Sequence, residues 1–361
     1  MTPGAEVTRL EVDLAAIIAN WRSLQNGAGN VAAVLKADAY GLGAAHVAPA
    51  LYAAGCRHVF VAHLDEALAI RPLLPGAMLA VLNGLWPGTE ATYVAHDLRP
   101  VLGSLAEIAA WAAEARRRER RLPALLHIDT GMNRLGLSDP ELDTLADDPS
   151  LLDGIGLEYV MTHLVSAENP TDPTNDRQRT RFAAACARLP PARRSLANSS
   201  GLFLGPAYAS HLARPGAALS GINPTPNRPN PMRPAVRLHA RILQTRDIPT
   251  GASVGYNGIW TAARPSRIAT VSVGYADGYP RSLGNQANAC FDGSPVPLVG
   301  RVSMDLTTFD VTDTPAAVPG TWLELIGPGN PIDDVAIRAG TNGYEILTSL
   351  GRRYARTYLP A

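Results

Sequence analysis

The chain has 361 residues, which at about 150 residues per domain predicts two domains. Hydrophobic residues make up 46% and charged residues 18%, a balance that is typical of globular proteins and excludes a disordered or coiled-coil chain. Lys plus Arg and Asp plus Glu each total 32, so no overall charge attracts nucleic acid or an anionic membrane. We therefore expect a small-molecule partner.

The terminal and apolar segments predict a cytoplasmic protein. The first residues, MTPGAEVTRLEVDLAAI, lack a positive region followed by an apolar run, so no signal peptide is expected. The best apolar stretch, 73–86, is short and contains Pro75 and Gly76, so no membrane span is expected. The cysteines are odd in number and widely spaced, which predicts free thiols without a disulfide framework or a metal site: Cys56, Cys186 and Cys290.

The first two thirds of the chain alternate short apolar runs with helical patterns. Apolar runs separated by helices are typical of parallel strands buried on both faces. Eight such units in about 220 residues predict an N-terminal (β/α)8 TIM-type barrel, an α/β fold. The predicted strands are 31–35, 58–62, 78–82, 100–102, 125–129, 157–163, 195–198 and 212–217, and the clearest helical patterns are 13–24, 44–54, 105–121 and 175–189.

The composition changes after Ser220. Residues 221–234 contain five prolines, which oppose a regular helix and indicate a linker. Strand-like runs divided by turn residues follow and predict a mostly-β C-terminal domain, with one short helix at 343–350. The runs are 235–247, 266–273, 296–311 and 321–326. We therefore predict a barrel domain over 8–230 and a β-rich domain over 231–361.

Lys36 is the only lysine in the chain, beside 31 arginines. Arg replaces Lys on a solvated surface but not where an amine must lose its proton and attack carbon. Lys36 follows the first predicted strand, and catalytic groups of such barrels lie at the carboxyl ends of strands. The preceding apolar run would lower the pKa of its amine. A surface lysine at the start of a loop is the competing interpretation.

Other polar residues follow the later predicted strands and would face the same mouth. Taken singly, His163 fits a core histidine, Arg134 a surface cation, and 198–201 the start of a helix. Together they describe a site for an anion bearing phosphate or carboxylate. The set is Asp129, Arg134, His163, Asn198, Ser199, Arg214 and Gly216. Asp129-Thr130-Gly131 also matches the aspartic protease loop, but eight βα units contradict that fold.

Nine segments, in order, resemble those of alanine racemases, which use pyridoxal 5′-phosphate (PLP). The first, AVLKADAYGLGA at 33–44, resembles their cofactor-lysine segment. The others are IDTGMNRLGL (128–137), MTHLVSAE (161–168), ANSSG (197–201), ARPGAALSGI (213–222), VGYN (254–257), VGYADGYPR (273–281), LVGRVSMD (298–305) and TNGYEI (341–346).

This resemblance implies a homodimer in which each active site borrows residues from the partner's second domain. It implies that Lys36 is covalently joined to PLP and that Arg214 faces the pyridine nitrogen. The residues that would hold the phosphate are Tyr40, Ser199, Gly216, Ala217 and Tyr344. Arg134 would lie near the ring phenolate. His163 would hydrogen-bond Tyr256 of the partner subunit. The residues that would contact the amino acid substrate are Arg134, Tyr275, Met304 and Asp305.

The resemblance also implies interconversion of L-alanine and D-alanine by two bases, Lys36 on one face of the substrate and Tyr256 on the other. Positions 127, 195 and 220 depart from the family pattern, and the last carries Ser where many members have Tyr. His127 stands where members often carry a carbamylated lysine that steadies Arg134, and Ser195 stands where His is common. The alternatives are a broader racemase that accepts serine, an amino acid decarboxylase, and a PLP carrier without activity. An Arg facing the ring nitrogen disfavours the decarboxylase.

Overall fold

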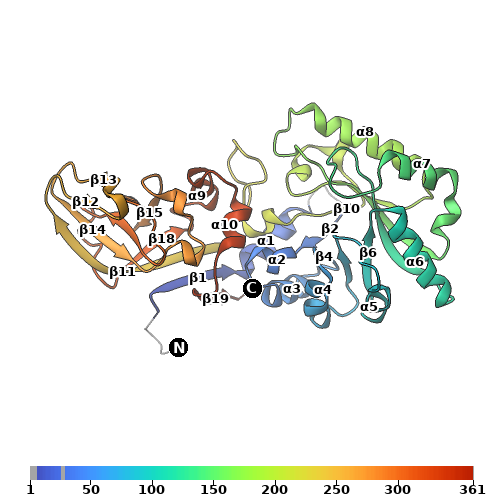
Figure 1. Ribbon diagram of the computed structural model, residues 1–361, viewed down its shortest axis with the longest axis horizontal. Coiled ribbons are helices and arrows are strands. Elements are labelled where there is room, and N and C mark those ends of the chain that lie inside the picture. The colour runs from blue at the N-terminus through green and yellow to red at the C-terminus, as the bar shows by residue number, and fades with distance from the viewer. Residues whose placement is uncertain (1–5, 26–28, 361) are drawn as a thin grey trace.

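The structure, a computed structural model, describes residues 6–25 and 29–360. Residues 1–5, part of the segment for which no signal peptide is expected, lie outside this range. Figure 1 shows two parts side by side, a β-rich part built mainly from the C-terminal third and a barrel-like part built from the residues before it. Within the described ranges, no helix has the length and apolar character needed to cross a membrane.

The barrel strands follow the predicted order. Strands β3 to β9 form one parallel sheet of seven strands in sequence order. Strand β10 pairs in parallel with β2, which immediately precedes β3, so the first and last strands meet. The bounds are β2 (Asn30–Val31), β3 (Ala33–Val34), β4 (His58–Val61), β5 (Met78–Val81), β6 (Leu98–Leu102), β7 (Leu122–His127), β8 (Ile155–Met161), β9 (Arg193–Ser195) and β10 (Leu212–Ala213). The first predicted strand is thus divided in two.

The seam between β9 and β10 differs from the other strand pairs. No ladder joins these two strands in the described part of the chain. Instead Ser195 Oγ donates to the Leu212 carbonyl at 2.6 Å, and the Leu196 N–H donates to Ser210 Oγ at 3.1 Å. One backbone bond, from the Arg214 N–H to the Ala197 carbonyl at 2.8 Å, follows. The predicted strands 195–198 and 212–217 are therefore short, because side chains replace their ladder.

Helices cover the outside of the barrel and begin at capping residues. Asp13, Ser104 and Asp172 each accept a backbone N–H in the first turn of α1, α6 and α8. Apolar side chains from the strands fill the interior, among them Phe60, Leu125 and Met161. The helices are α1 (Leu14–Ser23), α2 (Lys36–Tyr40), α3 (Ala44–Ala53), α4 (Leu64–Ile70), α5 (Glu90–Ala95), α6 (Leu105–Arg117), α7 (Asp139–Asp147) and α8 (Pro173–Ala187).

The C-terminal part is built on an eight-stranded sheet. Its longest strand is β11 (Val236–Ile248), which pairs with β1 (Thr8–Asp13), β14 (Ser266–Val271) and β18 (Trp322–Ile326). The remaining elements are β12 (Ser253–Val254), β13 (Trp260–Thr261), β15 (Asn288–Phe291), β16 (Ser294–Pro297), β17 (Thr307–Asp310), β19 (Ala355–Leu359), α9 (Ile332–Ala339) and α10 (Gly343–Ser349).

Two features of this sheet differ from the sequence interpretation. The run 296–311 is divided into β16 and β17, because Gly300 has a φ of +79° and the chain turns there. Strand β1 pairs with β11 and β19, so residues 8–13 lie in the sheet of the C-terminal part. The division of the chain near residue 230 stays a prediction.

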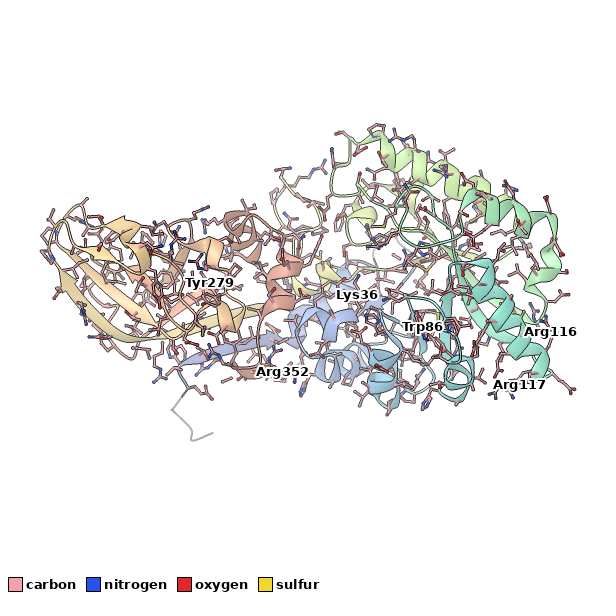
Figure 2. All side chains as sticks on the ribbon, viewed as in Figure 1. Lys36, Trp86, Arg116, Arg117, Tyr279 and Arg352 are labelled. Carbon is pink, nitrogen blue, oxygen red and sulfur yellow. The ribbon has the colours of Figure 1, made fainter. Side chains whose placement is uncertain are left out.

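The two parts meet at α2, the segment that carries Lys36. The Gly41 carbonyl accepts a hydrogen bond from Arg356 Nη1 at 2.6 Å, and a Cβ at Gly41 would overlap the Leu347 carbonyl of α10. Figure 2 places Lys36 near the middle of the molecule, between the two parts. The C-terminal part therefore supports one side of the barrel mouth.

Candidate active site

Lys36 begins a left-handed turn at the carboxyl end of β3. Residues 37–40 all have φ between +53° and +56°, although none is glycine. Left-handed helical conformation costs L-residues about 1–2 kcal/mol each, so the surroundings must hold it. The Glu66 carboxylate contributes: it accepts the N–H groups of Ala37 at 2.5 Å and of Ala62 at 2.8 Å. Neither the turn nor Glu66 is evident from the sequence, because Glu66 lies 29 residues further along.

The surroundings of Lys36 favour its neutral amine. Burial lowers the pKa of Lys36 below its ordinary value, the charge of Arg134 lowers it further, and Glu66 acts in the opposite direction. An amine with a lowered pKa is more often neutral at physiological pH, so a larger fraction of it is available as a nucleophile and base. This environment supports the chemical role that the uniqueness of Lys36 predicts.

Tyr40, Ser199 and Gly216 lie together near Lys36 and form a polar cluster that we call the cradle. Ser199 Oγ accepts the N–H groups of Gly216 at 3.2 Å and of Ala218 at 3.3 Å. A Cβ at Gly216 would overlap the Tyr40 hydroxyl and lie 2.7 Å from Tyr40 Cζ. Burial raises the pKa of Tyr40 to about 12, so its hydroxyl keeps its proton and can donate it to an anion. Hydroxyls and backbone N–H groups at one place suit a phosphate.

Tyr344 approaches this cradle from the C-terminal part. It lies at the start of α10, and its hydroxyl donates to Glu168 Oε1 at 2.6 Å. Glu168 follows β8, so the bond joins the C-terminal part to the loop that carries His163. Burial and the Glu168 carboxylate both raise the pKa of Tyr344. The hydroxyl therefore stays protonated as a hydrogen-bond donor.

Arg214 is buried and bound to three oxygen atoms. Its Nη1 donates to the Ser195 carbonyl at 2.9 Å and to Ser195 Oγ at 2.6 Å, and its Nη2 donates to the Thr162 carbonyl at 2.5 Å. Burial lowers the pKa of Arg214 to about 10, which still leaves it a cation at neutral pH. No carboxylate pairs with it within residues 6–25 and 29–360. Ser195 thus binds the guanidinium where the family often has His.

His127 and His163 lie close to positively charged side chains, and both are neutral at physiological pH. Burial, together with the charges of Arg214, Arg134 and Lys36, lowers the pKa of His163 to about 3. Burial likewise lowers the pKa of His127 to about 4, with Arg214 and Arg134 adding to the effect and Asp129 opposing it. Three basic side chains that follow different strands, Lys36, Arg134 and Arg214, therefore lie near these histidines, with two carboxylates, Glu66 and Asp129, close by. This excess of positive charge favours an anionic ligand.

The two histidines predict a loss of stability in acid. Their pKa values are lower in the folded protein than in the unfolded chain, so the unfolded chain binds more protons below about pH 6.5. We expect the free energy of unfolding to fall, by on the order of a few kcal/mol, between about pH 6.5 and pH 4. Chemical denaturation across this range measures it. His163→Gln should flatten the dependence, whereas His96→Gln, at an exposed position, should not. An unchanged slope in His163→Gln would contradict the prediction.

Asp129 shapes the loop that presents Arg134. Its Oδ1 accepts the N–H groups of Gly131 and Met132, both at 2.9 Å, and that of Asn133 at 3.2 Å. Burial would raise the pKa of Asp129, but these backbone bonds hold it below its ordinary value. The carboxylate is therefore occupied by its own loop, and the side chain of Arg134 is exposed at the mouth.

The other predicted site residues lie in the C-terminal part of the chain. Tyr256 is 67% exposed and lies between β12 and β13, which Figure 1 shows at the end of the molecule away from α2. Tyr275 and Met304 are also exposed and adjoin each other, since the Ala276 N–H donates to the Met304 carbonyl at 3.0 Å. Asp305 Oδ1 accepts from Arg353 Nη1 at 2.7 Å. A single chain therefore does not bring Tyr256 to Lys36.

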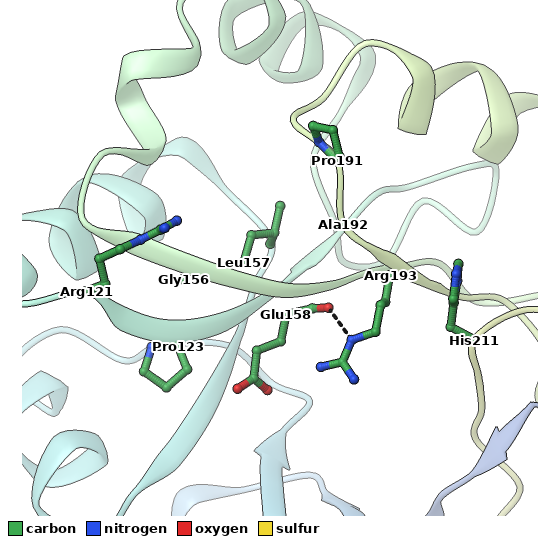
Figure 3. A pocket seen from close by; sticks show the side chains of 9 residues that line it. All are labelled: Arg121, Pro123, Gly156, Leu157, Glu158, Pro191, Ala192, Arg193 and His211. Atoms are coloured by element: carbon green, nitrogen blue, oxygen red, sulfur yellow. Dashed lines mark hydrogen bonds between the residues drawn. The ribbon is translucent and has the colours of Figure 1, made fainter.

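A separate depression of about 740 Å³ lies at the amino ends of β8 and β9, opposite the mouth. Figure 3 shows its lining, in which Arg193 Nε donates to the Glu158 carbonyl at 3.4 Å. None of the predicted site residues lines it. In the described ranges, no group of three or more His, Cys, Asp or Glu residues could hold a metal ion.

Comparison with known proteins agrees with this geometry. The alanine racemase N-terminal domain model matches residues 12–224, and the C-terminal domain model matches residues 235–358. Alanine racemase of Acidiphilium cryptum is 61% identical over 96% of this chain and 97% of its own length. Alanine racemase of Rhodospirillum rubrum is 52% identical over 97% of this chain and 95% of its own length.

Solved structures show the same architecture. Alanine racemase from Bartonella henselae, solved with covalently bound pyridoxal phosphate, has a TM-score of 0.94 at 40% identity and covers 98% of this chain and 99% of its own. Alanine racemase from Bacillus anthracis, solved with bound L-Ala-P, has a TM-score of 0.84 at 29% identity, with coverage of 99% and 96%. Both domain models match in order and the relatives align over nearly the whole chain, so this chain belongs to the alanine racemase family.

Proposed function

We propose that this protein is a PLP-dependent alanine racemase that interconverts L-alanine and D-alanine. The observation that carries the proposal is the placement of Lys36, with its lowered pKa, beside an anion cradle at the barrel mouth. Family membership supports it independently. The cofactor fits the residues present, because the cradle at Gly216 suits a phosphate and Lys36 supplies an amine.

The residues of the cradle have distinct tasks in binding PLP. Ser199 and Tyr40 would donate hydroxyl protons to the phosphate, and Gly216 leaves room for it. Tyr344 would donate its hydroxyl proton to the phosphate in exchange for the bond it makes to Glu168 in this structure. The Ala217 N–H, for which the described residues provide no acceptor, would donate as well. Lys36 would anchor the cofactor covalently. When bound, PLP withdraws electrons from the amino acid and so makes the hydrogen on its Cα acidic.

Arg214 would set the electronic state of the cofactor ring. A guanidinium held by Ser195 and Thr162 stays a cation and has no acceptor to offer, so it disfavours a proton on the pyridine nitrogen. The ring then withdraws electrons less strongly than a protonated one. Proton return at Cα is favoured over decarboxylation or transamination, which supports racemase over the decarboxylase.

Racemisation needs a proton carrier on each face of Cα, because one fixed base returns the proton to the side it came from. Lys36 would serve one face and Tyr256 of the partner subunit the other. His163, neutral at physiological pH, would hydrogen-bond that tyrosine, and Arg134 would bind the substrate carboxylate. Tyr275, Met304 and Asp305 of the partner subunit would line the entrance.

This arrangement requires a homodimer. Tyr256, Tyr275 and Met304 are large side chains that one chain leaves 67%, 42% and 54% exposed. Their exposure, and the place of the Tyr256 segment at the end of the molecule away from α2 (Figure 1), support a head-to-tail pairing that covers them and completes two equal sites. The cytoplasm is the location we propose for this dimer.

Gly216→Ala tests the phosphate cradle. The added Cβ would displace the Tyr40 hydroxyl, and overpacking of this kind typically costs about 1–3 kcal/mol. We expect PLP to bind about 10- to 100-fold more weakly in a fluorescence titration. Gly156→Ala is the matched control, since its Cβ would meet only ordinary contacts, the nearest at 3.5 Å. Unchanged PLP affinity in Gly216→Ala would count against the cradle.

The proposed activity is tested with purified protein, PLP and L-alanine in deuterated water. We expect D-alanine by chiral chromatography, with deuterium at Cα in the product. The same assay with L-serine measures whether the site accepts a larger side chain. PLP binding without D-alanine formation would support a carrier instead, and carbon dioxide release would support a decarboxylase.

A further inference from the structure

Gln178 is a buried amide of α8 that lies outside all nine family-like segments. It is 1% exposed and makes three hydrogen bonds to the loops that follow β7 and β8. Its Oε1 accepts the Val165 N–H at 2.9 Å. Its Nε2 donates to the His163 carbonyl at 2.9 Å and to Thr130 Oγ1 at 3.0 Å. The side chain of Gln178 therefore hydrogen-bonds to the backbone of both residues that flank Leu164, His163 and Val165.

The orientation of this amide is determined by its partners. A backbone N–H can only donate, so the atom facing Val165 must be the oxygen. The nitrogen then faces the His163 carbonyl, which can only accept. A single conformation of the Gln178 side chain therefore makes all three bonds. Replacing the amide would leave its buried partner atoms without a hydrogen bond, which is energetically costly.

A chain of buried contacts leads from Gln178 to Arg214. Thr130 Oγ1, which accepts from Gln178, lies 2.8 Å from Thr162 Oγ1. The carbonyl of the same Thr162 accepts from Arg214 Nη2 at 2.5 Å. Gln178, Thr130 and Thr162 are each at most 3% exposed, so water does not compete for these bonds. The pose of Thr162 is thus fixed from two sides, by Arg214 and by the α8 amide.

We propose that Gln178 is a positioning residue of the active site: through Thr130 and Thr162 it fixes Arg214, and through its backbone bonds it fixes His163. This inference rests on the proposed function, which assigns Arg214 to the cofactor ring and His163 to Tyr256. Gln178 itself touches neither the cradle nor Lys36. Its substitution should therefore change how the cofactor is held and not whether Lys36 can react with it.

A second buried amide of α8, Asn175, also hydrogen-bonds to the loop that follows β8. It lies one turn earlier on α8, is 1% exposed, and its Nδ2 donates to the Ser166 carbonyl at 3.2 Å and to the Asn169 carbonyl at 2.9 Å. The two amides together hold the loop 163–169, which also carries Glu168, the partner of Tyr344. Helix α8 therefore presents a buried polar face to the loop after β8, and one further bond joins it to Thr130 in the loop after β7.

Gln178→Met tests the proposal in the full-length enzyme, with and without PLP. Methionine keeps the volume and removes the amide. We expect faster hydrogen exchange at the Val165 amide, a shifted pH dependence of the visible absorbance of bound PLP, and a kcat about 10-fold lower with KM changed less than about 2-fold. Thr130→Val should give the same direction of change, and Thr130→Ser, which keeps the hydroxyl, should restore it.

Asn330→Leu is the matched control for the loss of a buried amide. Asn330 is 4% exposed in the C-terminal part and donates to the carbonyls of Asn288 at 2.8 Å and Leu325 at 2.7 Å. It should lower the melting temperature as Gln178→Met does but leave the absorbance and kcat unchanged. If Gln178→Met behaves like Asn330→Leu, the proposal is overturned. If the wild-type protein itself neither binds PLP nor racemises alanine, the proposed function fails instead.

Should Gln178→Met not fold, the test rests on Thr130→Val and Thr130→Ser. Thr130→Val removes a single hydroxyl at nearly constant volume and breaks only the link between Gln178 and Thr162. An unchanged absorbance profile and kcat in that variant would then overturn the proposal.

Discussion

Lys36→Ala is expected to abolish racemisation, with turnover at least about 10⁴-fold lower than in the wild type. The variant loses the amine that anchors PLP and the base that serves one face of the substrate. Since Lys36 is the only lysine in the chain, no other side-chain amine can replace it. The visible absorbance of lysine-bound PLP should disappear at the same time, which a spectrum of the purified variant measures.

Lys36→Arg is the matched control for a long basic side chain at this position. It can still contact Glu66, but a guanidinium does not lose its proton at neutral pH and cannot form the covalent link. We expect it to be as inactive as Lys36→Ala, although the fold is retained by circular dichroism. Activity in either variant above about 1% of wild type would contradict the assignment of Lys36 and, with it, the proposed mechanism.

Tyr256→Phe is expected to lower kcat by about 10²- to 10⁴-fold while PLP stays bound with its normal visible absorbance. The substitution removes only a hydroxyl, and one chain leaves this side chain 67% exposed, so the monomer fold should be unaffected. Kinetics in both directions, from L-alanine and from D-alanine, measure the loss. A variant with normal turnover would exclude Tyr256 as the second base.

Mixing the two inactive variants tests whether the site is shared. In a dimer of one Lys36→Ala subunit and one Tyr256→Phe subunit, both defects fall in the same site and the other site is intact. Refolding equal amounts together gives heterodimers as about half of all dimers, each with one working site, so about a quarter of wild-type activity should return. No recovery in a mixture shown to contain heterodimers would mean that each chain builds its own site.

The sequence by itself determined the helices and strands whose formation depends on the pattern of apolar residues over a short stretch of chain. Apolar runs such as 78–82 became barrel strands, and helical patterns such as 13–24 and 105–121 became helices, because strand and helix preferences are read over a few neighbouring residues. Lys36 could also be selected as a candidate without a structure, because it is the only lysine in the chain and follows an apolar run, while its chemical role stays a prediction. Nine ordered segments were enough to indicate the family.

Tertiary structure decided what depends on residues far apart in the chain. The left-handed turn after Lys36 is opposed by local preference and is held by Glu66, 29 residues away. Gln178 forms hydrogen bonds to residues 15 and 48 positions before it in the chain. Strand β1 precedes the barrel strands in the sequence but pairs with β11 in the C-terminal sheet. Such contacts form because polar groups that packing buries away from water must find hydrogen-bond partners within the protein. Those partners come from distant parts of the chain, so a pattern of a few neighbouring residues does not predict them.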